Sequence, residues 1–183
     1  MGTLIKIYIL HGWTYSTEKW EPFIKALREK GFEGVLLKIP GLTEESGKAW
    51  NLDMYVDWLY EKLTDEKNKI ILLGHSNGGR IASAFAAKYP GKVRKLILID
   101  SAGIYHKGLP IRLKRFLFKS VTMLGKKITQ SEKLRNILYK TTREKDYLEA
   151  SDLQRQTMIN LSSVDMIPKF SKLNIPTLII WGE

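Results

Sequence analysis

The chain has 183 residues, 44% of them hydrophobic, and carries a formal net charge of +11. This length suits one domain with a sizeable core, and the hydrophobic content excludes a disordered chain. No apolar stretch reaches the roughly 20 residues that cross a bilayer, and residues 1–10 alternate like a strand rather than resembling a signal peptide. We therefore expect a soluble cytoplasmic protein.

Cysteine is absent from the chain, and its three histidines are scattered. A thiolate nucleophile, disulfides and cysteine-ligated metals are excluded, and the histidines lack the spacing of a zinc site. We expect neither a metal nor a cofactor. Serine is the nucleophile that remains to be considered.

Strands and helices are expected to alternate through the first hundred residues. Apolar runs predict strands, and apolar residues at helical spacing predict helices. The strands are expected at 3–10, 33–39, 70–75 and 93–100, and the helices at 18–30, 52–63 and 80–89. Asn51 or Asp53 can cap the second helix. This order predicts an α/β fold, with a mostly parallel sheet, helices on both faces and ligands beyond the carboxyl ends of the strands.

The alternation then stops, because helical patterning continues without strands until a fifth strand is expected at 175–181. We interpret the intervening segment as a helical cap, or lid, inserted into the core. The predicted domains are a first core part at 1–103, the cap insert at 104–172 and a resumed core strand at 173–183.

The cap insert holds most of the positive charge, with 15 Lys and Arg against 6 Asp and Glu. A lysine-rich face most often serves solubility, although it can also meet phospholipid, nucleic acid or an anionic substrate. The apolar stripe from Leu113 to Leu124 fits either a cap helix or a membrane-surface helix. The aromatics Phe116, Phe118 and Tyr139 are too sparse for a base-stacking platform, so we expect no nucleic-acid partner.

Residues 70–79 carry the strongest functional signal. An apolar run breaks into a Gly-x-Ser-x-Gly sequence at 74–78, and a small-residue helix follows. A serine on such a sharp strand-to-helix turn has its hydroxyl raised above the sheet, and small neighbours prevent collisions with adjoining backbone. This pattern predicts a nucleophile at Ser76.

Four motifs in order make the whole chain resemble the α/β-hydrolase superfamily, in the branch of serine hydrolases with a helical cap. The motifs are His11-Gly12-Trp13, Gly74-His75-Ser76-Asn77-Gly78-Gly79, Leu96-Ile97-Leu98-Ile99-Asp100, and Ile175 to Glu183. The resemblance implies hydrolysis of a small-molecule ester, thioester or amide. It implies Ser76 as the nucleophile, the backbone N–H groups of Trp13 and Asn77 as the oxyanion hole, and Gly74, His75, Gly78 and Gly79 as the elbow.

The sequence departs from the family pattern at the acid and the base. The resemblance places the acid just beyond a strand ending in Trp-Gly-Glu and the histidine after one further strand, whereas this sequence ends at Glu183. We therefore expect an incomplete chain, without a catalytic histidine and inactive alone. His11 and His75 are expected to be structural, His106 is the only substitute base, and Asp100 is an alternative acid.

Two other functions stay open. The chain can be a non-catalytic binding protein on a hydrolase scaffold, although a decayed elbow has no reason to keep an exposed serine. It can also be half of a split enzyme, completed by a second chain that supplies the C-terminal part.

Overall fold

The structure is a computed structural model that describes residues 4–14, 16–103 and 150–182. The chain divides into two units, Met1–Ile104 with Ser151–Glu183, and Tyr105–Ala150. All the elements below belong to the first unit. The apolar stripe of the predicted cap, together with His106, lies outside the described residues. Because most of the predicted cap is not described, its boundaries at 104 and 172 stay a prediction.

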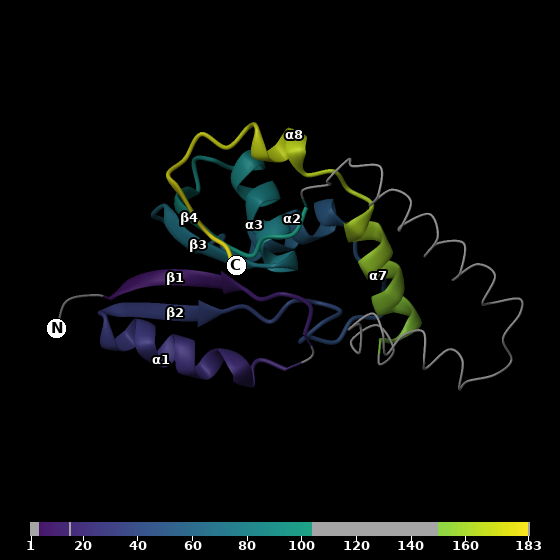
Figure 1. The fold of residues 1–183 in the computed structure, drawn as a ribbon, viewed down its shortest axis with the longest axis horizontal. Coiled ribbons are helices and arrows are strands. Elements are labelled where there is room, and N and C mark those ends of the chain that lie inside the picture. The colour runs from purple at the N-terminus through teal and green to yellow at the C-terminus, as the bar shows by residue number, and fades with distance from the viewer. Residues whose placement is uncertain (1–3, 15, 104–149, 183) are drawn as a thin grey trace, which may run out of the picture. The chain divides into compact units, whose positions relative to one another are not determined.

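Five strands form one parallel sheet in the order β2-β1-β3-β4-β5 (Figure 1). The strands are β1 Ile5–Leu10, β2 Phe32–Leu36, β3 Ile70–His75, β4 Val93–Ile99 and β5 Thr177–Ile180. This arrangement confirms the predicted α/β fold with its parallel sheet. The chain runs outward from β1 to β2 and then crosses back to β3, so the strand order reverses between β1 and β3. Ligands of parallel sheets bind at the carboxyl ends of the strands at such a point.

Helices cover both faces of the sheet. They are α1 Glu21–Glu29, which follows a 3-10 turn at Glu18–Trp20, α2 Leu52–Lys62 and α3 Asn77–Lys88. Because strand side chains alternate between faces, Ile7 and Ile9 pack beside α1, while Tyr8 and Leu10 join the cluster with α2 and α3. Figure 1 shows α1 on one face of the sheet and α2 and α3 on the other.

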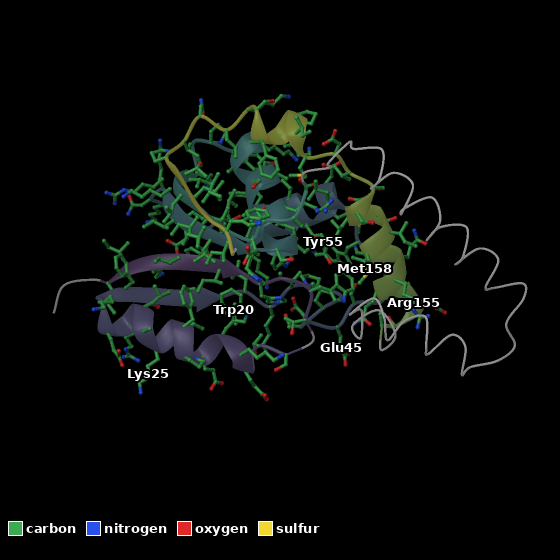
Figure 2. The ribbon with its side chains drawn as sticks, viewed as in Figure 1. Trp20, Lys25, Glu45, Tyr55, Arg155 and Met158 are labelled. Atoms are coloured by element: carbon green, nitrogen blue, oxygen red, sulfur yellow. The ribbon has the colours of Figure 1, made fainter. Side chains whose placement is uncertain are left out.

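The larger core lies under α2 and α3. Its fully buried members include Leu10, Ile39, Tyr55, Leu59, Leu72, Ile81, Phe85 and Leu96. Asn51 caps α2 by accepting a hydrogen bond from the Met54 N–H at 2.9 Å, which confirms one of the two predicted caps. The Tyr55 hydroxyl donates to the Pro40 carbonyl at 2.8 Å, and the interior position of this side chain is visible in Figure 2. The loop after β2 is thereby fixed to the core.

The chain returns to the sheet through two helices, α7 Asp152–Ser162 and α8 Ile167–Phe170. The α7 helix begins with a capping box between Ser151 and Gln154. The Trp50 N–H donates to the Thr157 hydroxyl at 2.9 Å, which ties α7 to the segment before α2. The α8 helix was not predicted, since a single turn leaves no periodic pattern to detect.

The edge strand β5 is the least covered part of the sheet. Leu178 is 55% exposed and Ile179 is 63% exposed, although the two side chains point to opposite faces. Among the described residues, no helix combines the length and the apolarity needed to cross a membrane.

Candidate active site

Ser76 is the single residue between the end of β3 and the start of α3. Its φ of 51° and ψ of −115° are rare for a residue with a side chain. Within the described part of the chain, Asp100 is the only other non-glycine residue with a positive φ. Such backbone strain costs about 1–3 kcal/mol and persists only where the surroundings enforce it.

Three backbone hydrogen bonds enforce the conformation of Ser76. Its N–H donates to the Ile99 carbonyl at 3.0 Å, and its carbonyl accepts from the Gly79 N–H at 3.1 Å and from the Ala102 N–H at 2.9 Å. The turn is therefore held between the end of β4 and the first turn of α3. The serine is about half-buried rather than enclosed.

The glycines of the elbow allow very close backbone approach. A Cβ at Gly78 would lie 2.1 Å from the Leu10 carbonyl oxygen, and one at Gly74 would lie 2.5 Å from the Gly79 Cα. Real Cβ atoms do not come this close to backbone, so neither position accepts a larger residue without movement of β1, β3 or α3. The elbow is pressed directly against the end of β1.

The turn after β1 passes beside the nucleophile. A Cβ at Gly12 would lie 3.0 Å from the Cβ of Ser76 and 2.9 Å from Nδ1 of His75. Trp13 follows immediately, is half-buried and packs against the larger core. The structure thus brings the backbone of residues 12–13 close to Ser76. Asn77, the other residue expected in the oxyanion hole, directly follows Ser76 in the sequence.

His11 is fully buried and fixes this turn. Its Nδ1 lies 2.7 Å from the Gly12 carbonyl oxygen and its Nε2 lies 2.7 Å from the Thr43 hydroxyl, which accepts from the Ile39 N–H. Burial lowers the pKa of His11 and thereby favours the neutral ring. In the tautomer that satisfies every partner, Nδ1–H donates to Gly12 and Thr43 donates to Nε2. Both ring nitrogens are therefore engaged away from Ser76.

His75 lies against the 3-10 turn that precedes α1. Its ring packs edge-on against Trp20, with the centroids 5.8 Å apart and the planes at 71°. Of the two described histidines, His11 thus binds the turn after β1 and His75 packs against the 3-10 turn before α1. His106, the third, lies outside the described residues.

Asp100 directly follows β4 and is hydrogen-bonded to the end of β5. Its N–H donates to the Ile180 carbonyl at 3.0 Å, and its Oδ1 accepts from the Gly182 N–H at 2.8 Å. One carboxylate oxygen of the alternative acid is therefore occupied at the end of the edge strand.

Two contacts near the site were not anticipated from the sequence. Thr43 binds His11 across 32 residues, and the 7%-exposed Arg80 donates from Nη1 to the carbonyls of Leu161 and Val164. Arg80 thereby fixes the first turn of α3 to the last turn of α7 and the residues just after it. No local pattern signals either contact, because both depend on loops brought together by the fold.

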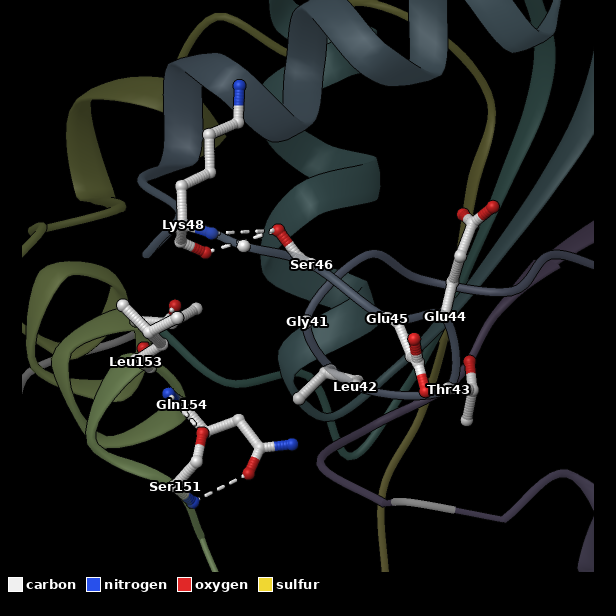
Figure 3. Close-up of a pocket in the computed structure, with 12 residues that line it drawn as sticks. Gly41, Leu42, Thr43, Glu44, Glu45, Ser46, Lys48, Ser151, Leu153 and Gln154 are labelled. Atoms are coloured by element: carbon white, nitrogen blue, oxygen red, sulfur yellow. Dashed lines mark hydrogen bonds between the residues drawn. The ribbon is translucent and has the colours of Figure 1, made fainter.

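A pocket of about 570 Å³ opens between the loop after β2 and the first turns of α7 (Figure 3). Its walls include Leu42, Thr43, Ser46, Leu153 and Gln154. Thr43 connects it to the turn after β1 through His11. Within the described residues, no group of three His, Asp or Glu side chains is placed to hold a metal ion.

Comparison with known proteins gives a consistent result. A family described as alpha/beta hydrolase fold matches residues 6–183. Lipase 3 of Moraxella sp. (strain TA144) is 30% identical over 123 residues, which cover 60% of this chain and 39% of that lipase. Lipase 1 of Psychrobacter immobilis is 27% identical over 198 residues, which cover 97% of this chain and 61% of that lipase. The chain thus spans less than two thirds of the length of both lipases.

The fold is shared with solved structures as well. A bacterial membrane phospholipase A superposes with a TM-score of 0.69 at 22% identity, over 98% of this chain and 63% of that structure. At this level of identity the likeness shows the fold alone.

Proposed function

Because the chain belongs to the alpha/beta hydrolase fold family, we propose that it provides the nucleophile and the oxyanion hole of a serine hydrolase acting on small-molecule esters. The observation that carries this proposal is the strained backbone of Ser76, held beside the turn after β1. The lipase relatives favour an ester over a thioester or an amide as the substrate.

The first step forms a bond between the Ser76 Oγ and the carbonyl carbon of the ester. The proton of the hydroxyl passes to a general base, and the carbonyl oxygen becomes an oxyanion. The backbone N–H groups of Trp13 and Asn77 are the proposed donors to it. Collapse of the intermediate expels the alcohol, which takes the proton, and water then releases the acid from Ser76.

Neither described histidine is placed to act as the general base, so the base is proposed to be either the substitute His106 or a group from outside residues 1–183. His11 has both ring nitrogens bonded away from Ser76, and His75 packs against Trp20. A serine hydrolase without its base retains about 10³–10⁴-fold of catalysis over water, from the oxyanion hole and binding. We therefore expect residues 1–183 alone to hydrolyse p-nitrophenyl butyrate only weakly.

The lack of a free histidine beside Ser76 among the described residues makes a direct test possible. Free imidazole can act as a general base in place of a histidine side chain, so it should raise the p-nitrophenyl butyrate rate of the wild-type chain above that of Ser76→Ala. The Ser76→Ala protein is the matched control, since imidazole alone also cleaves this ester. Equal rates for both proteins at every imidazole concentration would contradict the proposal and favour a binding protein on a hydrolase scaffold.

A second chain that supplies the base and acid is tested separately. Co-expression with a C-terminal hydrolase segment should give a complex in which a fluorophosphonate probe labels Ser76, as read by peptide mass spectrometry. Labelling that persists in Ser76→Ala would show that another residue is the nucleophile. The alternative acid Asp100 is tested in the same complex, where Asp100→Asn lowers the labelling rate only if this carboxylate orients the base.

A further inference from the structure

A second pocket lies at the edge of the sheet opposite to Ser76, where β3 and β4 begin. It has a volume of about 470 Å³, and it is formed by the loops that precede these two strands, by Tyr60 of α2 and by Lys88 at the end of α3. Four lysines and two tyrosines dominate its walls, and no carboxylate lines it: Lys67, Lys69, Lys88, Lys92, Tyr60 and Tyr89.

Local structure accounts for only one of these lysines. Lys88 stands in the last turn of α3, where a cation is favoured, and its ammonium lies 2.7 Å from the Asp57 carboxylate. Lys67, Lys69 and Lys92 belong to loops and form no ion pair within the described part of the chain. The carboxylate next to Lys67, that of Glu66, is bound by Lys6 and by the Tyr8 hydroxyl. Three lysines without an ion pair among the described residues therefore line one hollow.

The tyrosine rings give this hollow a fixed wall. The centroids of Tyr60 and Tyr89 are 4.6 Å apart, and Tyr89 also packs at 5.3 Å against the fully buried Phe85. The ammonium of Lys92 lies 5.5 Å from the centre of the Tyr60 ring, and that of Lys88 lies 5.2 Å from the centre of the Tyr89 ring. Such contacts between cations and aromatic faces hold the lysine side chains in place.

We propose that this pocket binds a small molecule carrying two or more linked phosphate groups, at a site separate from Ser76. The positive charge of the loop lysines attracts a polyanion, and the attraction grows with the number of negative charges that the ligand carries. Lysine is a common phosphate ligand, and the volume lies within the ordinary range for small-molecule sites. This inference does not depend on the proposed hydrolase activity.

Calorimetric titration of residues 1–183 with sodium pyrophosphate, sodium triphosphate and ATP tests the site. We expect saturable binding of one molecule per chain, weakened by added salt because the attraction is electrostatic. Removing two of the unpaired charges in Lys67→Gln/Lys92→Gln should weaken binding at least about fivefold. The matched control is Lys19→Gln/Lys25→Gln, which removes the same charge from the exposed α1 side, where Figure 2 marks Lys25.

The comparison of ligands separates the possible sources of the phosphate. Tighter binding of ATP than of triphosphate, lost in Tyr60→Leu, would identify a nucleotide that uses the ring, whereas equal binding would identify the phosphate chain alone. The proposal is overturned if none of the three ligands binds saturably, or if both double variants weaken binding equally. Binding only to vesicles containing phosphatidic acid would also overturn it, because a membrane surface would then be the ligand. Thermal melting of both double variants confirms that they are folded.

Discussion

The ends of β1 and β3 and the outer strand β5 belong to the same sheet but differ in how fully they are supported. In β1 and β3, Leu10 and Leu72 are fully buried, and beyond the end of β3 Ser76 is held by three backbone hydrogen bonds. At β5, every described residue from Thr177 to Gly182 is exposed. The nucleophile is therefore built into the part of the sheet that has neighbours on both sides.

This contrast separates two requirements of the proposed chemistry. A strained serine needs surroundings that enforce its backbone, and these are present around residues 74–79. The catalytic acid of the proposed chemistry needs only the end of a strand to carry it. The end of β5 is held by pairing with β4 and by the hydrogen bond from the Gly182 N–H to Asp100. The two regions should therefore respond very differently to the same substitution.

Glycine-to-alanine substitution should show the largest difference between them. A Cβ at Gly78 would lie 2.1 Å from a backbone oxygen of β1, whereas one at Gly182 would lie 3.7 Å from the Asp100 carboxylate, an ordinary contact. We expect Gly78→Ala to lower the free energy of unfolding by at least about 3 kcal/mol and Gly182→Ala to change it by less than about 0.5 kcal/mol. Urea unfolding followed by circular dichroism measures both, and equal effects would contradict the contrast.

Leucine truncation compares the packing of the same two regions. Leu72 is fully buried in β3 and Leu178 is 55% exposed in β5. Leu72→Ala removes buried apolar contacts and leaves a cavity, so it should cost about 3 kcal/mol of unfolding free energy. Leu178→Ala should cost less than about 1 kcal/mol. A cost at Leu178 as large as that at Leu72 would show that β5 is covered in solution.

The sequence predicted the supported region well because its signals are local. Apolar runs located β1, β3 and β4, and the glycines at 74 and 78 marked the turn at which backbones meet. The α3 helix begins at Asn77 rather than at the predicted residue 80, since the two glycines that weaken the helical pattern are tolerated inside its first turn.

Contacts between distant loops escaped prediction. Thr43 sits in a polar loop, and neither its type nor its spacing indicates that it binds a buried histidine at the end of β1. The sequence does not indicate the burial of Arg80 either, because a charged residue early in a helix is usually exposed. The contacts of Thr43 and Arg80 depend on which loops the topology of the fold brings together.

The buried imidazole of His11 predicts a smaller, pH-dependent effect in the supported region. Burial lowers the pKa of the folded-state ring below its ordinary value, so the unfolded chain binds the proton more readily. The stability that His11 contributes is present above its unfolded-state pKa and is lost as the pH falls toward the folded-state value. Urea unfolding between pH 7.5 and 5 should show falling stability, with a shallower fall in His11→Gln. An unchanged slope would show that this ring does not titrate on unfolding, and His75→Gln is the matched control.

The smallest effect on stability, with a clear effect on association, is expected at the uncovered strand. Among the described residues no strand pairs with the outer edge of β5, and exposed apolar side chains lie beside that edge, an arrangement that favours pairing with another copy of the chain. Ile179→Lys puts a charge on this edge and should make residues 1–183 more monomeric in analytical ultracentrifugation, while unfolding free energy changes by less than about 0.5 kcal/mol. Ile159→Lys, at a 52%-exposed position on α7, adds the same charge away from the sheet. If both variants reduce association equally, the added charge is responsible; a reduction in Ile179→Lys alone assigns the self-association to the open edge of β5.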